Sequence, residues 1–310
     1  MPERRQLEFT VPLSSPFSLE HTLESGQLFR WERRGEWWVG VVAGSVLKVK
    51  QEGEVLRSVS GSDLQDSGFL TRYFRLDDDL DHILATLAKD EVISRASERF
   101  YGLRLVRQEK WECLASFVLA TNSNIPRIRR MVETVCARFG GQIMFEGEPY
   151  RSFPPPESVA AAPVAELAAC GLGYRAPFLK RVAASVASGQ IDLGALPSLR
   201  YEDARKLLLT ELLGEKLLLG VGPKVADCVL LYSCDQDEAF PIDVWIAKVL
   251  AESYPRLLGP VLRKRYSNER KVRLSPSDYA KISRRARSYF GEYSGYAQQY
   301  LFMAAREGSD

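Results

Sequence analysis

Two side chains that can take part in covalent chemistry lie in the most informative stretch of the sequence. Lys224 follows the turn sequence GVGP at 220–223, and Asp243 lies nineteen residues later in the segment PIDVW. A lysine in the first turn of a helix is unfavourable for stability, because the helix dipole places partial positive charge there. A partly desolvated, neutral amine at that position is a nucleophile near neutral pH. Contact with a phosphate explains the lysine equally well.

Asp243 directly precedes an apolar helical stretch, which makes it a good candidate for the N-cap of a helix. Capping alone is a common reason for an aspartate at such a position. A carboxylate held by helix amides also stays ionised, ready to stabilise a developing cation or to activate an attacking group. The sequence therefore leaves both roles open for Asp243.

The turn before Lys224 indicates how the segment could bind a polyanion. A helical pattern runs into Gly220, and Pro223 suits the first position of a second helix. Gly220 and Gly222, with Val221 between them, let the backbone approach a ligand closely, and the amides at a helix start attract phosphate oxygens. This helix, hairpin and helix, at about 204–232, favours sequence-independent binding of a nucleic-acid backbone over a purely structural turn.

The elements that must position these side chains fall into two parts. Residues 7–59 contain short apolar segments divided by glycine turns, which predicts an antiparallel sheet. From about Asp77 the apolar spacing becomes helical and stays so almost to the end, so the remainder is predicted to be all-α. We therefore expect an α+β fold: an N-terminal antiparallel β-sheet domain with helices at 1–105, then helical domains at 106–310 that contain the helix-hairpin-helix.

Composition narrows the class of protein. The chain has 310 residues, 45% hydrophobic and 26% charged, which is ordinary for a folded protein. It lacks an apolar run long enough for a membrane helix, and its first residues lead into no signal core, so we expect an intracellular protein with no membrane partner. Five dispersed cysteines and two histidines predict no disulfide framework and no metal site.

Charge is segregated along the chain although the net charge is only +2. Residues 255–287 are strongly basic and residues 52–91 are acidic. Such a chain can present one positive face to phosphates, although a solvated helix face explains the basic run equally well.

At these residues the sequence resembles a known family. The hairpin with Lys224 and Asp243 resembles the helix-hairpin-helix DNA glycosylases, and GVGPKVADC with PIDVW resembles their 8-oxoguanine DNA glycosylase branch, in which the lysine is the nucleophile. Two positions depart from the pattern. Leu219 replaces the proline that usually precedes the first glycine. Trp245 replaces a histidine thought to contact a phosphate, and its indole can instead pack or donate one hydrogen bond.

Segments near both ends resemble the base pocket of this family. ESGQLFRW contains Gly26, whose carbonyl, by the resemblance, accepts a hydrogen bond from the N7 hydrogen that 8-oxoguanine has and guanine lacks. GYAQQYLF places Phe302 to stack on the flipped base and Gln298 to bond its Watson–Crick edge, with Cys228 on the opposite face. Without the resemblance, Gly26 would be a turn glycine and Phe302 a core residue.

Two central segments, ATNSNIPRI and GLGYRA, resemble the part of the family that holds the duplex open. The resemblance implies that Asn122 fills the gap left by the extruded base, that Arg127 and Arg175 read the orphaned cytosine, and that Tyr174 wedges the stack. A helix cap would also explain Asn122, and phosphate contacts would explain the arginines.

The resemblance implies a bifunctional DNA glycosylase and apurinic-site lyase that excises 8-oxoguanine opposite cytosine in base excision repair. Lys224 would attack the sugar C1′ of a flipped nucleotide, and a Schiff base would allow β-elimination. The expected partner is double-stranded DNA containing the lesion, bound by a monomer. No metal or organic cofactor is required, and a structural cation at the hairpin backbone is left open.

Two other functions remain open from the sequence. One is a helix-hairpin-helix glycosylase for other oxidised or alkylated bases, because the pocket residues rest on the resemblance. The other is a non-catalytic DNA-binding helix-hairpin-helix protein in which Lys224 only touches phosphate. A base pocket disfavours the second, since a protein that only grips the backbone needs none.

Overall fold

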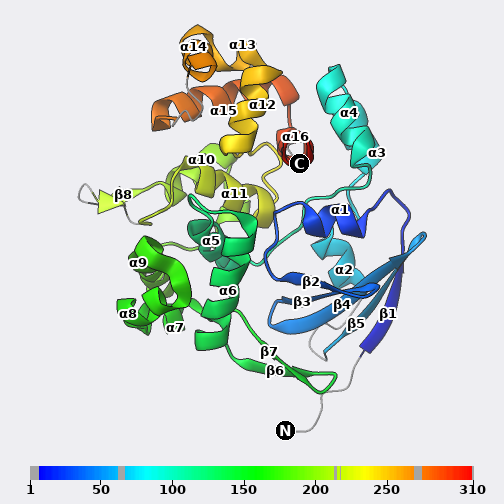
Figure 1. Ribbon diagram of the computed structural model, residues 1–310, viewed down its shortest axis with the longest axis vertical. Helices are drawn as coiled ribbons and strands as arrows, with labels where there is room; N and C mark the ends of the chain where they lie inside the picture. Colours follow the sequence, from blue (N-terminus) through cyan, green and yellow to red (C-terminus); the bar gives the residue numbers. More distant parts are fainter. Residues whose placement is uncertain (1–6, 62–66, 213–214, 217, 269–273, 309–310) are drawn as a thin grey trace.

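The N-terminal sheet forms where the alternating pattern predicts it. The computed structural model describes residues 7–61, 67–212, 215–216, 218–268 and 274–308 (Figure 1). Five antiparallel strands pair in the order β1-β5-β4-β3-β2: β1 (Leu7–Pro12), β2 (Trp31–Arg34), β3 (Trp37–Val42), β4 (Ser45–Glu52) and β5 (Val55–Ser60). One face buries Trp31, Leu47 and Leu56 against side chains of α1 (Leu19–Glu24) and α2 (Ser67–Tyr73).

A second core lies among the helices that follow. They are α3 (Leu80–Leu87), α4 (Glu91–Arg99), α5 (Lys110–Leu119), α6 (Ile125–Phe139), α7 (Pro156–Ala161), α8 (Val164–Leu167), α9 (Ala176–Ala187), α10 (Tyr201–Leu208), α11 (Pro223–Ser233), α12 (Val244–Glu252), α13 (Pro255–Leu258), α14 (Pro260–Asn268), α15 (Pro276–Phe290) and α16 (Ser294–Glu307). The last turns of α11 are buried throughout, from Val225 to Ser233, and α11 packs on α5. The α+β fold is confirmed, with α11 near the centre of the helical part (Figure 1).

The α3 and α4 helices follow the sheet in sequence but pack with the last helix. Both contact α16, and Leu80, Ile93 and Phe100 belong to the same buried cluster as the side chains of α11. The chain thus returns at its C-terminal end to the side of α1, α3 and α4, as Figure 1 shows. This return brings α16 against the segment that follows α1.

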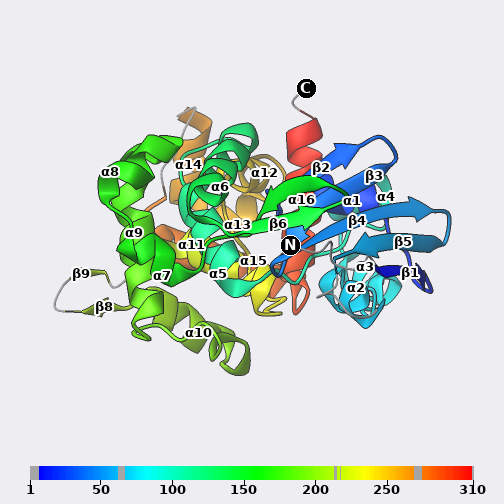
Figure 2. The same ribbon diagram turned by 90° about the horizontal axis from the view of Figure 1, so that it is seen from below.

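The expectation that everything after the sheet is all-α was wrong at two places. A hairpin of β6 (Gln142–Phe145) and β7 (Glu148–Arg151) lies beside the sheet, and Figure 2 shows β6 near β4. Its turn has positive φ at Glu146 and Gly147, the geometry that matches the twist of paired strands. Phe145 is buried against Val39, Val41, Val46 and Val59 on the outer face of the sheet.

The second difference concerns the helix expected to run into Gly220. The α10 helix ends at Leu208, and the short strands β8 (Glu211–Leu212) and β9 (Glu215–Lys216) follow it, while residues 213–214 and 217 lie outside the described residues. The leucines at 207–209, 212–213 and 217–219 occur in runs. Runs mark no single helical face, so they do not require a continued helix.

Within the described part of the chain, no helix is long and apolar enough to cross a membrane. The five cysteines are all unpaired and buried. The same described residues hold no cluster of three or more histidine, cysteine or acidic side chains arranged for a metal ion.

Candidate active site

Lys224 lies in the first turn of α11, directly after the glycine turn. Gly222 has an extended backbone and occupies the N-cap, and Pro223 begins the helix, as expected for a proline at that position. Gly220 has a φ of +88°, and a Cβ there would lie 2.9 Å from the Phe178 ring. Glycine is therefore required at 220 for both conformation and space.

The amine of Lys224 faces aromatic and thiol groups inside the molecule. Its Nζ lies 4.8 Å from the centre of the Phe117 ring on α5, and it contacts the Cys228 thiol one turn along α11. Burial raises the pKa of Cys228 to about 11, an effect that the positive charge of Lys224 opposes. Cys228, predicted to touch the flipped base, is thus a neutral thiol next to the amine.

Asp243 caps α12, as the sequence predicts, and its carboxylate also interacts with the charge of Lys224. Its Oδ1 accepts the backbone N–H groups of Trp245 at 3.0 Å and Ile246 at 2.9 Å. Burial raises the pKa of Asp243, while the Lys224 charge and these amides favour its ionised form. Capping and chemistry are therefore compatible, because the helix amides fix the carboxylate where it interacts with the Lys224 charge.

A line of contacts leads from Lys224 to α16. The Phe117 ring stacks on Tyr232 with 5.4 Å between their centres, and the Tyr232 hydroxyl lies 3.5 Å from Oε1 of Gln298. Gln298 is buried and Phe302, one turn later, is partly buried. Gln298 is thus linked to Lys224 through two aromatic rings, and Phe302 lies one turn further along α16.

Gly26 adjoins Phe302, although the two residues are far apart in sequence. Gly26 follows α1 with a φ of +79°, and a Cβ there would lie 3.0 Å from Ile125 Cδ1 and 3.2 Å from Phe302 Cε1. Any side chain at position 26 would fill the space between these walls. The structure therefore brings Gly26 and Phe302 together, and it places Cys228 and Gln298 along the contacts that begin at Lys224.

The residues predicted to hold the duplex open form a separate cluster. Asn122 is exposed with a φ of +50°, and its amide donates to the Tyr174 hydroxyl at 3.3 Å. Tyr174 is 51% exposed, as a wedge must be. Asn122 is not the helix cap that was the alternative for it, because Asn124 caps α6.

The two predicted cytosine readers are placed differently. Arg127 is exposed in the first turn of α6, whereas Arg175 is only 1% exposed. The Arg175 guanidinium donates to the carbonyls of Thr121 and Asn122, each at 3.0 Å, and lies over the Tyr174 ring. Cytosine reading by Arg175 stays a prediction, and it requires the guanidinium to leave these carbonyls.

Sequence reasoning missed the buried support beneath α11. Asp227 is fully buried and accepts hydrogen bonds from Tyr201 at 2.8 Å, Tyr279 at 2.7 Å and Arg205 at 2.9 Å. Burial raises the pKa of Asp227, and the Arg205 charge opposes this effect. An acidic residue inside the apolar run VADCVLL is the signal that could have identified it.

A second omission is the pair Gln299 and Arg306 on α16. Gln299 donates to the Ser25 carbonyl at 2.8 Å and Arg306 to the Glu24 carbonyl at 2.7 Å. The adjacent glutamines in GYAQQYLF hint at a second buried polar residue, but only the fold shows where it points.

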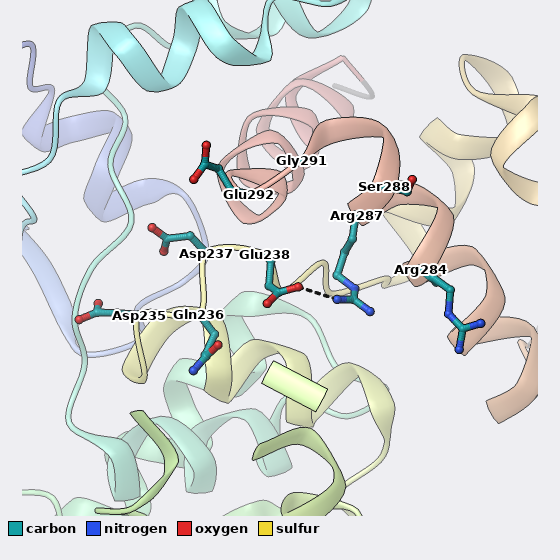
Figure 3. Close-up of a pocket in the computed structure, with 9 residues that line it drawn as sticks. All are labelled: Asp235, Gln236, Asp237, Glu238, Arg284, Arg287, Ser288, Gly291 and Glu292. Carbon is teal, nitrogen blue, oxygen red and sulfur yellow. Dashed lines mark hydrogen bonds and ion pairs between the residues drawn. The ribbon is translucent and has the colours of Figure 1, made fainter. Parts of the chain in front are cut away.

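An open cavity of about 580 Å³ lies at the other end of α11 from Lys224, and Figure 3 shows its lining. Its lining residues are Asp235, Gln236, Asp237, Glu238, Arg284, Arg287, Ser288, Gly291 and Glu292. Asp237 pairs with Arg75 at 2.6 Å, and Glu238 pairs with Arg287 at 2.7 Å. The cavity contains none of the predicted site residues, and three of its acidic groups are held by arginines, since Asp235 also pairs with Arg107 at 2.9 Å.

Comparison with known proteins shows which family the chain belongs to. The family model of the 8-oxoguanine DNA glycosylase N-terminal domain matches residues 10–114, and that of the HhH-GPD superfamily base excision DNA repair proteins matches residues 115–256. The chain is 31% identical to the N-glycosylase/DNA lyase of Saccharomyces cerevisiae, over 93% of this chain and 83% of the yeast protein.

Two further proteins are similar over nearly the whole chain. A probable N-glycosylase/DNA lyase of Methanothermobacter thermautotrophicus is 30% identical over 94% of each chain. The Clostridium acetobutylicum 8-oxoguanine glycosylase/lyase, solved with double-stranded DNA containing cytosine opposite 8-oxoguanine, is 28% identical with a TM-score of 0.85, and the match covers 100% of both chains. The chain therefore belongs to the 8-oxoguanine DNA glycosylase family within the HhH-GPD superfamily of base excision DNA repair proteins.

Proposed function

We propose that this protein is a bifunctional DNA glycosylase and apurinic-site lyase that removes 8-oxoguanine paired with cytosine in base excision repair. The observation that carries the proposal is that both a carboxylate and a candidate base pocket are connected with Lys224. The charge of Lys224 acts on Asp243 of α12. Phe117 and Tyr232 link the amine to Gln298 of α16, and Gly26 adjoins Phe302 of the same helix. A protein that only grips the DNA backbone needs neither feature.

The glycosylase step uses the amine as nucleophile. Nζ of Lys224 attacks C1′ of the flipped nucleotide while the glycosidic bond breaks, and the base leaves with the bonding electrons and takes up a proton. Asp243 stabilises the positive charge that develops on the sugar. Its raised pKa also suits it to accept the proton that the Lys224 ammonium must lose before attack.

The lyase step follows from the covalent bond to Lys224. Opening of the sugar ring converts the C1′ adduct into a Schiff base, which makes a C2′ proton acidic. Loss of that proton expels the 3′ phosphate and breaks the strand. Hydrolysis of the imine then frees the amine.

The pocket supplies the preference for the lesion. The Gly26 carbonyl accepts the N7 hydrogen of 8-oxoguanine, Phe302 and Cys228 contact the two faces of the base, and Gln298 bonds its Watson–Crick edge. A buried acceptor denied its donor costs about 1–3 kcal/mol, so guanine, which has no N7 hydrogen, is rejected.

The remaining predicted residues act on the duplex. Four side chains hold the opened stack and the orphaned cytosine: those of Asn122, Tyr174, Arg127 and Arg175. The backbone of Gly220, Val221 and Gly222 binds the DNA phosphates, with Trp245 beside them, and a cation held by hairpin carbonyls would support the same contact. Because a single chain supplies every proposed catalytic and pocket residue, we infer that a monomer acts on DNA inside the cell.

A base-release assay tests the proposal. Duplex DNA with 8-oxoguanine opposite cytosine is incubated with excess protein, and free base and strand breaks are measured. We expect release and cleavage by the natural protein, whereas Lys224→Gln still binds lesion DNA but releases less than about one thousandth as much base per unit time. Full residual excision by Lys224→Gln would contradict the assignment of the nucleophile.

The rival lesion class is tested in parallel. Duplexes carrying alkylated or other oxidised bases are compared at the same protein concentration. Faster release of one of these bases than of 8-oxoguanine would keep Lys224 as the nucleophile and overturn the pocket assignment.

A further inference from the structure

We propose that Gln299 and Arg306 of α16 are positioning residues that set the lesion selectivity of the pocket by fixing the peptide segment around Gly26. The inference rests on the proposed function, in which the Gly26 carbonyl accepts a hydrogen bond from the lesion. Neither residue is part of the predicted set that contacts DNA or base.

The carbonyls on both sides of Gly26 are held by side chains. Arg306 Nη2 donates to the Glu24 carbonyl at 2.7 Å, and Gln299 Nε2 donates to the Ser25 carbonyl at 2.8 Å. On the other side, Gln108 Nε2 donates to the Gln27 carbonyl at 2.8 Å. Among the described residues, no group donates to the Gly26 carbonyl itself. The one acceptor without a protein donor is thus the one proposed to meet the base.

Gln299 is fixed at both ends of its amide. It is 1% exposed, its nitrogen holds Ser25, and its oxygen accepts a hydrogen bond from the Tyr232 hydroxyl. Tyr232 stacks on Phe117, over which the Lys224 ammonium lies. The position of the pocket backbone is therefore tied to the position of the nucleophile by rigid, buried side chains.

Arg306 fixes two walls of the pocket at once. Its guanidinium carbon lies 5.8 Å from the centre of the Phe302 ring, and Nη1 would lie 3.2 Å from a Cβ placed on Gly26. One side chain therefore sets the spacing between the stacking ring and the acceptor segment. A change of that spacing alters base binding without touching Lys224 or Asp243.

Rigidity is what converts a single hydrogen bond into selectivity. A carbonyl on a loose segment can turn toward water when guanine offers no N7 hydrogen. Guanine then loses little binding free energy relative to the lesion. A carbonyl fixed by neighbouring hydrogen bonds cannot turn, so it stays without a donor when guanine is bound. The full free energy of that unsatisfied acceptor then weakens the binding of guanine. Loosening the segment should therefore reduce discrimination more than it reduces the chemical step.

The test measures selectivity separately from chemistry. Arg306→Met keeps the length of the side chain but removes its donors, and Arg306→Lys retains one donor. For each variant we would measure 8-oxoguanine excision, cleavage of a preformed abasic site, and, with Lys224→Gln added, the ratio of affinities for lesion and undamaged duplex. Cleavage of the abasic site needs no base pocket and reports on folding and on Lys224.

We expect Arg306→Met to lower the affinity ratio and the excision rate about tenfold, with abasic-site cleavage within about twofold of the natural protein. Arg306→Lys should have an affinity ratio and an excision rate between those of the natural protein and Arg306→Met. Gln299→Met should act in the same direction as Arg306→Met. Arg99→Met is the matched control, because exposed Arg99 of α4 pairs with Glu307 of α16 at 3.1 Å. Within the described chain, none of its hydrogen bonds involves the segment around Gly26.

Two results would overturn the inference. One is an unchanged affinity ratio in Arg306→Met and Gln299→Met. The other is an equal loss of lesion excision and abasic-site cleavage, which indicates general damage and no role in selectivity. If the natural protein releases no 8-oxoguanine at all, the proposed function itself fails, and that outcome is distinct from both.

Discussion

The helix that carries Lys224 and the loop that carries Asn122 are built in opposite ways. From Val225 to Ser233, α11 is buried, and Asp227 within it is bound by two tyrosines and an arginine. Asn122 is exposed in a left-handed conformation and is held by Tyr174 and Arg175. Within the described chain, the buried hydroxyls of Thr121 and Ser123 beside it have no hydrogen-bond partner.

In the proposed function, this difference separates the chemical step, assigned to Lys224, from duplex opening, assigned to Asn122. A nucleophile must be held in one geometry, and a fully bonded, buried helix provides that. A loop that enters an opened duplex must change its partners on binding, and strained backbone with unsatisfied hydroxyls lowers the cost of that change. The comparison predicts that substitutions under α11 affect stability or catalysis strongly, and that substitutions in the loop affect mainly DNA opening.

The largest effect should come from breaking the support of α11. Asp227→Asn leaves the Arg205 guanidinium without its buried counter-charge, and we expect a loss of about 3–5 kcal/mol in the free energy of unfolding. Urea denaturation measures this. Asp203→Asn is the control, because its pair with Arg200 is exposed and should be worth less than about 1 kcal/mol. Equally small losses of unfolding free energy in Asp227→Asn and Asp203→Asn would show that α11 does not depend on its buried support, and the contrast with the Asn122 loop would fail.

Asp243→Asn tests the carboxylate without removing the cap. Asparagine caps helices as well as aspartate does, so α12 should keep its start. We expect excision about a hundredfold slower with lesion binding nearly unchanged, because only charge stabilisation and proton transfer are lost. Single-turnover excision and a binding titration measure the two quantities. An excision rate close to that of the natural protein would show that Asp243 only caps α12 and has no part in the chemistry.

Asn122→Ala should have a smaller effect, of the opposite kind. The variant loses the contact with Tyr174 and the side chain proposed to fill the vacated gap, but no buried partner. We expect excision to slow about tenfold, with cleavage of a preformed abasic site less affected and the free energy of unfolding within about 0.5 kcal/mol. A loss of stability as large as that of Asp227→Asn would show that the loop is also structural.

A change of pH near neutrality should have the smallest effect on the excision rate. Burial raises the pKa of Asp243 above its ordinary value, so the carboxylate takes up a proton at a higher pH than a free aspartate does. If the ionised form is required, the excision rate falls about tenfold per pH unit below that raised pKa. A rate profile for the natural protein and Asp243→Asn measures this. If the fall in the excision rate at low pH persists unchanged in Asp243→Asn, the titration of another group causes it.

Much of the fold could be predicted from the chain because its patterns are local. Alternating segments from Leu7 to Val59 form the predicted sheet, and Asp243 caps a helix as its neighbours indicate. The helix expected before Gly220 was wrong, because runs of leucine carry no helical period. The β6–β7 hairpin was missed because its turn, Glu146-Gly147, is a weaker signal than the helical segments around it.

The site was only partly predictable for a different reason. Lys224 and Asp243 stand in a recognisable motif, and Gly26 and Phe302 in two others, so the resemblance named them before their proximity was known. Gln299 lies within the segment GYAQQYLF but at a position to which the resemblance gives no role, and Arg306 lies beyond that segment. Since α16 is buried on nearly all sides in its first turns, sequence alone does not show which face meets the segment after α1.

Borohydride trapping tests the central claim most directly. Protein is mixed with duplex DNA carrying 8-oxoguanine opposite cytosine, reductant is added, and covalent protein–DNA complexes are separated. We expect a band with the natural protein that disappears with Lys224→Gln, because reduction fixes the Schiff base formed by that amine. An equally strong band with Lys224→Gln, or no band with either the lesion or a preformed abasic site, would contradict the central claim.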